Sequence, residues 1–362
     1  MLIALEEYKR LFRRAFFRDC AVRSRNAFMF IRETSLTDAE LAEEEEGGYN
    51  PDLRPKGIIT YIRGVPEFQP GNQWFISPQY GWETIVLGSA LKPLDQSVSV
   101  ERTAVFPSMD HRVYVTGSGP AYQDESLASM SDKTAKAGIA VTRGAVTRLK
   151  QLDGWLYGCG SGRTLFKRLD KGTWESFSQD IPRVPDERHV GSSEEGFEDF
   201  DGWSESDIYA VGGYGDVWHF DGKGWRQIPF PTKEPLKSVC CGGDGQVYIS
   251  GYEGVTFVGR GDRWKKIFDG GISLGFRDMV WYEDRVWCTS DYGLWTIHEE
   301  RVGVADVPPT VAACAGHLSV GDGVLLLAGY SGAAFRERGA WQQIVSFHTM
   351  ETLLDAEAHG RG

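Results

Sequence analysis

A recurring order of apolar runs and glycine-bearing turns marks the second half of the chain. One copy begins at 208–211, where branched and aromatic residues favour a β-strand. A turn that ends at Gly215 follows, and then a second apolar run at 216–220. The Asp-Gly turn at 221–224 leads to a short strand that opens with Trp225. This order predicts successive antiparallel strands joined by tight turns.

The order repeats every 39 residues. Four of the turns end in glycines at this interval, namely Gly215, Gly254, Gly293 and Gly332. Trp225 and Trp264 keep the same interval, and Trp341 comes one residue early. A further apolar run precedes three of the copies, at 237–241, 278–282 and 317–320, so each copy contains four strands. Four antiparallel strands in about 40 residues are the signature of one β-propeller blade.

Weaker copies of the repeat extend toward the N-terminus. A fifth begins at Trp155, a sixth lies at 112–117 and a seventh at 74–81. We therefore predict an all-β fold, a β-propeller of seven four-stranded blades over 57–347, with six blades as the alternative. Residues 1–56 are expected to form an N-terminal extension, and 348–362 a C-terminal tail.

Several motifs of the repeat resemble a known group of propellers. The runs Asp207-Ile-Tyr-Ala-Val-Gly212 and Gly215-Asp-Val-Trp218, with Asp221-Gly before Trp225, are similar to bacterial repeats of the Asp-box (BNR) type. That group includes sialidase-like and photosynthesis-assembly-factor-like propellers. Ser290-Asp-Tyr-Gly-Leu-Trp295 approaches the Asp-box pattern but is two residues shorter. The resemblance covers 57–347 and implies blades without the group's catalytic residues, and this fold hosts many unrelated functions.

The N-terminal extension differs in pattern from the repeats. Leu5, Tyr8, Leu11, Phe12, Ala15 and Phe16 follow helical spacing, with basic residues between them. We expect a helix that packs on the propeller; a membrane-surface or partner-docking helix is the alternative. A strand is expected at 27–32, and this strand or the one at 57–61 is expected to complete a blade from the other terminus. Residues 43–46 are expected to form an acidic surface loop.

Charge and cysteine content narrow the function classes. The formal net charge is −12, which argues against nucleic-acid binding, because phosphate contacts need clustered Lys and Arg. No apolar stretch approaches the roughly 20 residues that span a bilayer. The six cysteines lack metal-type spacing, so reduced thiols in the cytoplasm are the simplest interpretation. We expect a cytoplasmic protein.

A search for chemistry finds no catalytic constellation in the sequence. The seven histidines show no paired spacing, which predicts no metal site. The glycine-rich segment 158–163 belongs to a hairpin rather than preceding a helix, so we expect no phosphate-binding loop and no cofactor. The cysteines occupy core positions of the repeat and are expected to act as small hydrophobes.

The candidate binding residues are aromatic turn residues and charged residues near the starts of inner strands. The first set recurs in the turn between the second and third strands: Tyr214, Tyr252, Tyr292 and Tyr330. The second set is Lys237, Arg277, Asp278 and His317. The irregular segments 118–137 and 178–195 are expected to add specificity.

We therefore predict a non-enzymatic protein-binding module that uses one loop-rich face. A more specific hypothesis is an immunity protein that neutralises a cognate toxin, with the acidity favouring a basic partner. The alternatives are a carbohydrate-active or lyase-type propeller enzyme, using the charged inner-strand residues, and a structural scaffold or assembly subunit.

Overall fold

The computed structural model describes eleven stretches of the chain. They are residues 2–47, 56–70, 85–90, 92, 102–107, 112–116, 122–126, 146–170, 173–182, 196–290 and 292–359. The chain divides into two compact units. The first comprises Met1–Glu83, Thr289–Leu294 and Val304–Gly362, and the second comprises Thr84–Cys288 and Trp295–Gly303.

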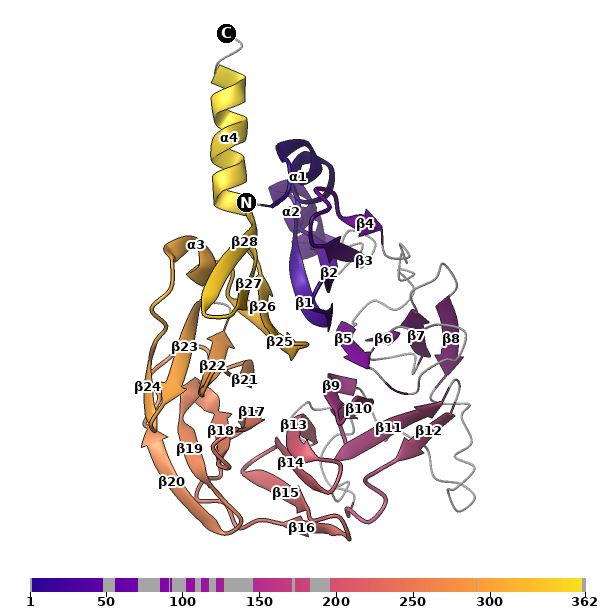
Figure 1. Cartoon of the computed structure of the whole chain (residues 1–362), viewed down its shortest axis with the longest axis vertical. Coiled ribbons are helices and arrows are strands. Elements are labelled where there is room, and N and C mark those ends of the chain that lie inside the picture. The colour runs from indigo at the N-terminus through magenta and orange to yellow at the C-terminus, as the bar shows by residue number, and fades with distance from the viewer. Residues whose placement is uncertain are drawn as a thin grey trace. The chain divides into compact units, whose positions relative to one another are not determined.

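The described strands form four-stranded sheets, and in each sheet the strands pair in chain order (Figure 1). The first sheet consists of β1 (Ala15–Ser24), β2 (Ala27–Thr34), β3 (Lys56–Ile62) and β4 (Gln69–Pro70). Two sheets follow it in the chain: β5 (Ile85–Ala90), β6 (Arg102–Pro107), β7 (Arg112–Thr116) and β8 (Tyr122–Ser126), and then β9 (Val146–Leu152), β10 (Trp155–Gly160), β11 (Thr164–Asp170) and β12 (Thr173–Ser176).

The sheets of the strong repeats come next. Their strands are β13 (Phe197–Ser204), β14 (Asp207–Gly212), β15 (Asp216–Phe220) and β16 (Trp225–Gln227); β17 (Leu236–Cys241), β18 (Val247–Gly251), β19 (Thr256–Arg260) and β20 (Arg263–Phe268); β21 (Asp278–Tyr282), β22 (Arg285–Ser290), β23 (Gly293–His298) and β24 (Arg301–Val304); and β25 (Gly316–Gly321), β26 (Val324–Gly329), β27 (Gly332–Glu337) and β28 (Ala340–Ser346). The predicted four-strand repeat is confirmed, including the additional first strands β17, β21 and β25.

The predicted number of blades in residues 57–347 is wrong. The described residues of this range form six complete four-stranded sheets rather than seven. At its start β3 and β4 pair with β1 and β2, from the segment that we expected to be a helical extension. The copy at 112–117 is the third strand of its sheet, and the expected copy at 74–81 lies outside the described residues.

The predicted strand exchange between the two ends of the chain is also wrong. β2 pairs with β1 and β3, whereas β25–β28 all come from one continuous segment. Each of these sheets is therefore built from sequence-local strands. Exchange is not needed, since the N-terminal segment supplies enough strand-forming residues for a sheet of its own.

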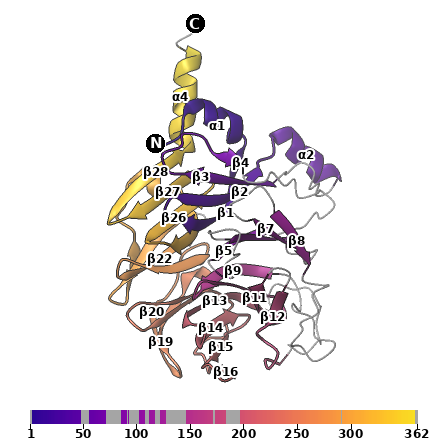
Figure 2. The same cartoon turned by 45° about the vertical axis from the view of Figure 1, so that its right-hand side comes forward.

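The N-terminal helix is shorter than its apolar spacing suggested. α1 (Leu5–Leu11) ends before Ala15 and Phe16, which begin β1. Pairing with β2, from Ala15 opposite Thr34 to Ser24 opposite Ala27, outweighs the helical pattern. α1 lies beside α4 (Phe347–His359), where Tyr8 Oη donates to Glu351 Oε1 at 2.5 Å (Figures 1 and 2). The α1 helix therefore packs on the fold, as expected, and the C-terminal tail forms α4.

The acidic segment 43–46 belongs to a helix and not to a loop. α2 (Asp38–Gly47) has no buried residue, so its charges are solvated. Thr37 and Glu40 begin it with a capping box: the Glu40 N–H donates to Thr37 Oγ1, and the Thr37 N–H donates to Glu40 Oε2. The sequence contained this signal, Thr37-Asp-Ala-Glu40.

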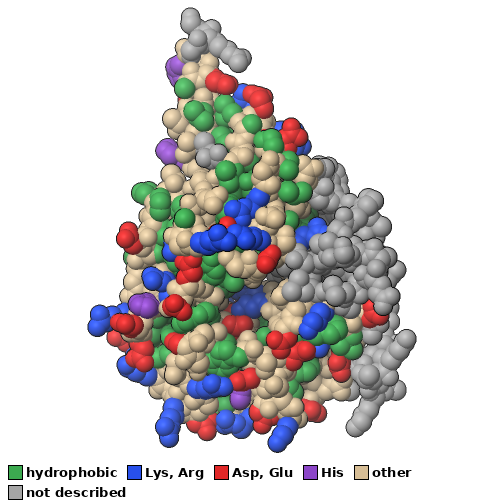
Figure 3. Space-filling view, in the orientation of Figure 1, with side chains coloured by type: hydrophobic (Ala, Val, Ile, Leu, Met, Phe, Trp, Pro, Cys, Tyr) green, Lys and Arg blue, Asp and Glu red, His purple; other side chains and the backbone are tan. Residues whose placement is uncertain are grey.

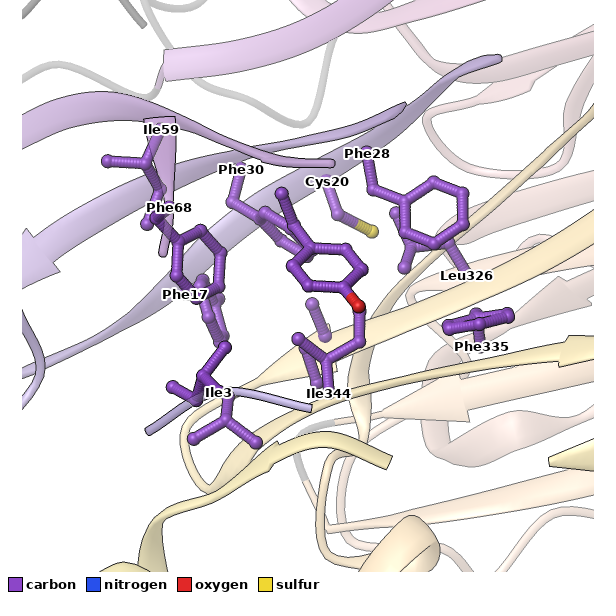
Figure 4. Close-up of a cluster of buried hydrophobic side chains, with 14 of the residues drawn as sticks. Ile3, Phe17, Cys20, Phe28, Phe30, Ile59, Phe68, Leu326, Phe335 and Ile344 are labelled. Atoms are coloured by element: carbon purple, nitrogen blue, oxygen red, sulfur yellow. The ribbon is translucent and has the colours of Figure 1, made fainter. Parts of the chain in front are cut away.

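Aromatic packing holds the first unit together. Side chains of β1–β3 meet those of β26–β28 in one buried cluster, in which Phe28 lies 5.0 Å from Phe335 and Phe17 lies 4.6 Å from Phe30, ring centroid to ring centroid (Figure 4). All six residues of β26 are buried, because this strand is covered on both faces. The first unit therefore joins the N-terminal and C-terminal sheets through a single core.

In the second unit, apolar clusters lie between consecutive sheets. One joins β9–β11 to β13–β15, with Tyr157, Cys159 and Phe200 fully buried. Another joins β14 and β15 to β17 and β18. These cores fix the first strand of each sheet, which carries the charged residues described below.

Candidate functional site

The four turn tyrosines are exposed, as the repeat predicted. Their exposed fractions are 53% for Tyr214, 57% for Tyr252, 81% for Tyr292 and 49% for Tyr330. Tyr330 stacks on Phe16 in the first unit, with ring centroids 4.3 Å apart. Tyr292 also belongs to the first unit, whereas Tyr214 and Tyr252 belong to the second.

Backbone hydrogen bonds bring the turns of Tyr214 and Tyr252 to one face of the second unit. Gly215, at φ +68°, donates its N–H to Glu234 O at 3.1 Å. Tyr214 and Pro235 form a β-bridge, and the Tyr252 N–H donates to Pro235 O at 2.9 Å. One connecting segment, ending at Pro235, thus holds both turns, and we call this surface the tyrosine face.

A third loop extends the tyrosine face. Ile272 donates its N–H to Glu253 O at 3.1 Å, which places the loop before β21 next to the Tyr252 turn. Leu274 in this loop is 42% exposed. The face therefore presents two tyrosines and a leucine from three consecutive loops of a packed scaffold. Exposed aromatic side chains of this kind are favourable anchors in protein interfaces.

β-Bulges occur at the same position in successive first strands. Register shifts at Phe197/Asp199 and Leu236/Ser238 leave Glu198 and Lys237 as the extra residues. A bulge re-aims its extra side chain away from the regular ladder. Lys237 Nζ lies 3.7 Å from Glu198 Oε1, with the lysine 44% and the glutamate 20% exposed.

Asp199 connects three first strands. It is fully buried, and its carboxylate accepts the backbone N–H of Val239 at 3.0 Å and that of Phe200 at 2.9 Å. Lys150 Nζ of β9 lies 2.8 Å from Asp199 Oδ1. Arg148 Nε of the same strand lies 3.5 Å from it. One carboxylate therefore ties β9, β13 and β17 together.

Within this cluster, burial and the neighbouring charges act on the pKa of each group in opposite directions. Burial alone lowers the pKa of Lys150, but the Asp199 and Asp201 carboxylates outweigh it and hold that pKa above its ordinary value of 10.5. Burial raises the pKa of Asp201, although Lys150 and the Cys241 N–H favour its ionised form. The cation at position 150 is thus well matched, whereas the second carboxylate is only partly compensated.

Three of the four predicted inner-strand residues, Lys237, Arg277 and Asp278, belong to the second unit. Asp278 is buried and forms an ion pair with Arg148, whose Nη2 also donates to Arg277 O at 2.8 Å. Lys237 lies on β17, where its Nζ is 3.7 Å from Glu198 Oε1. His317 belongs to the first unit, where its Nδ1 lies 3.6 Å from Asp19 Oδ1.

Sequence reasoning missed Glu198, Lys150, Asp199 and Asp201 as members of this cluster. A signal was present for Glu198, because it precedes Lys237 by the 39-residue interval of the repeat. The loop at 178–195, whose length breaks the interval upstream, concealed the relation of Lys150 to the later strands. Most of that loop and of segment 118–137 lies outside the described residues.

The six cysteines are free and buried, as predicted for core positions. Burial raises the pKa of Cys314 to about 12 and that of Cys288 well above its ordinary value of 9.0. A thiol held neutral is a poor nucleophile. In the part of the chain that the structure describes, no three His, Cys, Asp or Glu side chains gather as a metal site would require.

Several charged side chains of the described residues form ion pairs. Figure 3 shows acidic beside basic side chains on the described part of its face, and Arg226 Nη1 lies 2.7 Å from Asp262 Oδ1. The inner cluster joins strands through carboxylates, cations and backbone N–H groups, an arrangement that stabilises a scaffold. In the second unit, Tyr214 and Tyr252 present exposed aromatic rings. Of the described helices, none has the length and apolar character needed to cross a bilayer.

Comparison with known proteins supports the fold and adds a relative. No family model matches the sequence. Over 248 residues the chain is 29% identical to Immune protein Tsi7 of Pseudomonas aeruginosa, a match that covers 67% of this chain and 74% of that protein.

Two solved structures are similar at low identity. The WD40 β-propeller domain of Doa1 aligns over 87% of this chain and 90% of its own, with a TM-score of 0.50 and 9% identity. Virginiamycin B lyase from Staphylococcus aureus aligns over 72% of this chain and 88% of its own, with a TM-score of 0.49 and 11% identity. The Doa1 likeness supports the β-propeller fold and nothing further.

Proposed function

We propose that this chain is a non-enzymatic immunity protein that neutralises a cognate toxin by binding it. One observation carries the proposal: the 29% identity to Immune protein Tsi7, which extends over 67% of this chain. A match of that length spans several blades rather than one repeat motif. It supports the immunity hypothesis that the acidic, repeat-built sequence suggested on its own.

The turn tyrosines are the binding residues of this proposal, Tyr214, Tyr252, Tyr292 and Tyr330. Tyrosine offers a large contact area with little loss of side-chain entropy, and packed sheets fix its position before binding. Tyr214 and Tyr252 lie on the tyrosine face, where hydrogen bonds to the segment ending at Pro235 hold their turns. The turn tyrosines would bind a complementary surface of the toxin, and the bound chain would block the toxin.

The charge and cysteine chemistry of the chain support two further parts of the proposal. A net charge of −12 favours encounter with a basic toxin and disfavours nucleic acid as a partner. Six free, buried cysteines suit the reducing cytoplasm, where we place the neutralisation. We do not propose the enzymatic alternative, because the buried Asp278 is engaged by Arg148.

The proposal is tested by expressing the products of the neighbouring genes in a sensitive host, each with and without this chain. We expect one product to stop growth and this chain to restore it. We also expect the two purified proteins to elute as a one-to-one complex in size-exclusion chromatography with light scattering. Failure of every neighbouring product to form a complex would contradict the proposal.

Removal of the tyrosine rings is expected to weaken that complex. Tyr214→Ala and Tyr252→Ala should each raise the Kd about thirtyfold, because truncating a central aromatic anchor costs about 2 kcal/mol. Tyr→Phe variants should retain most of the affinity if the ring area is what matters. Isothermal titration calorimetry against the purified toxin measures both changes.

Lys223→Ala provides the matched control. Lys223 is exposed in the turn between β15 and β16, at the opposite end of β15 from Tyr214. Its removal should leave the Kd within twofold. Equal effects at positions 214 and 223 would show that the tyrosine face is not where the toxin binds.

A further inference from the structure

At the bulges of β13 and β17, the residue before the bulge has the same character in both strands, whereas the bulged residue differs in charge. The residue before each bulge is apolar and buried, Phe197 in β13 and Leu236 in β17. The bulged residue itself changes from Glu198 to Lys237, and its side chain is released from the ladder. Packing therefore requires an apolar residue before the bulge, whereas the bulged residue can carry either charge.

Each bulge lies next to a turn tyrosine of its own sheet. Phe197 pairs with Gly212, two residues before Tyr214, and Leu236 pairs with Gly251, directly before Tyr252. A Cβ atom on Gly212 would lie 2.9 Å from the backbone nitrogen of Glu198, which confirms the close approach of these two backbones. The backbone therefore brings an acidic residue, Glu198, near the turn of Tyr214, and a basic residue, Lys237, near the turn of Tyr252.

The Glu198 carboxylate is only partly neutralised. Its side chain is 20% exposed, and Lys237 Nζ stands at 3.7 Å, beyond hydrogen-bonding distance. Burial raises the pKa of Glu198, although the charges of Lys237 and Arg148 lower it and that of Asp199 adds to the increase. Arg148 is itself engaged with Asp278 and Asp199. A further cation near Glu198 would therefore be stabilising.

We propose that Glu198 and Tyr214 form a receptor for one basic side chain of the toxin, an arginine or a lysine. The inference rests on the proposed function and specifies the recognition at its binding face. A carboxylate beside an exposed aromatic ring suits a cation, which gains an ion pair from the first and a cation–π contact from the second. Lys237 is 44% exposed, so its side chain is not held by burial.

Charge complementarity favours a cation over an anion at this point. The chain has a net charge of −12, and the neighbouring loops expose Glu234 and Glu253 together with Lys233. An anionic partner group near Lys237 would also approach Glu198. The two bulge residues thus discriminate between partners, because a toxin without the basic side chain would cover the Glu198 carboxylate without adding a cation to it.

Exchanging the charges of Glu198 and Lys237 tests recognition of the toxin separately from the stability of the fold. The double variant E198K/K237E keeps an opposite-charge pair across the two bulges, but it places a lysine where the toxin's basic group would bind. We expect Glu198→Gln to raise the Kd about thirtyfold and E198K/K237E to raise it more than a hundredfold. The probe is the purified neighbouring-gene product that stops growth, titrated at 50 and 300 mM NaCl.

Asp262→Asn is the matched control for Glu198→Gln. It also removes one negative charge, from the turn between β19 and β20 at the opposite end of β19 from Tyr252, and should leave the Kd within twofold. Circular dichroism and thermal unfolding check that every variant is folded. Retained wild-type affinity in E198K/K237E would overturn the receptor and leave the proposed function standing. A wild-type chain that binds none of the neighbouring products would overturn both.

Discussion

Replacement of Asp199 by asparagine is expected to lower the free energy of unfolding by about 3 kcal/mol, the lower end of the cost of breaking a buried ion pair. The asparagine amide can accept one of the backbone N–H groups that Asp199 now accepts, but it carries no charge. Lys150, whose Nζ lies 2.8 Å from the carboxylate, would then keep its charge in a largely buried position. The loss would also loosen the join between β13 and β17 made by the Val239 N–H.

Guanidinium unfolding followed by tryptophan fluorescence measures this effect. Asp262→Asn is again the control, because the ion pair of Asp262 with Arg226 is exposed at 62% and 54% and such pairs contribute about 0–1 kcal/mol. If the two single Asp→Asn variants were equally stable, Asp199 would not connect the strands energetically.

Alkaline pH is expected to unfold the protein steeply. Burial raises the pKa of five thiols above 9.0, their ordinary value: Cys159, Cys240, Cys241, Cys288 and Cys314. Above pH 9 these groups lose their protons in the unfolded chain and keep them in the folded one. The unfolded state then binds fewer protons, so the free energy of unfolding falls as pH rises.

The free energy of unfolding should fall steeply with pH because all five thiols ionise over the same pH range in the unfolded chain. Each contributes about 1.4 kcal/mol per pH unit once it is ionised in the unfolded chain, so five give roughly 7 kcal/mol per pH unit. Guanidinium midpoints at pH 7.5, 8.5, 9.5 and 10.5, in reducing buffer, measure the curve. Cys288→Ala should lower the overall stability but reduce the slope by about one fifth. Constant stability up to pH 10.5 would contradict the burial of these thiols.

The repeat was predictable from the sequence because glycines and apolar runs recur where blade geometry needs them. Gly215 illustrates this: at φ +68° it takes a conformation that other residues rarely adopt. The first sheet was not predictable in this way, since β1 and β2 contain no copy of the motif and Ala15 and Phe16 also fit a helix. Only the pairing of these strands decides between the two structures.

The candidate site was predictable to the extent that it follows the repeat. Tyr214 and Tyr252 occupy equivalent turns, and both are exposed as expected. Asp199 was missed because its role depends on Lys150, which belongs to a strand before the inserted loop. The bulge that releases Glu198 depends on hydrogen-bond register, which the residue pattern alone does not reveal.

The shared core of the first unit has a consequence for synthesis of the chain on the ribosome. Phe28 emerges long before Phe335, a side chain that covers it and lies far later in the sequence. At 5–20 residues per second the ribosome needs roughly 15–60 s to make the intervening segment. The aromatic surface of the sheet β1–β4 must therefore stay uncovered during that time, and we expect a chaperone to protect it on the nascent chain.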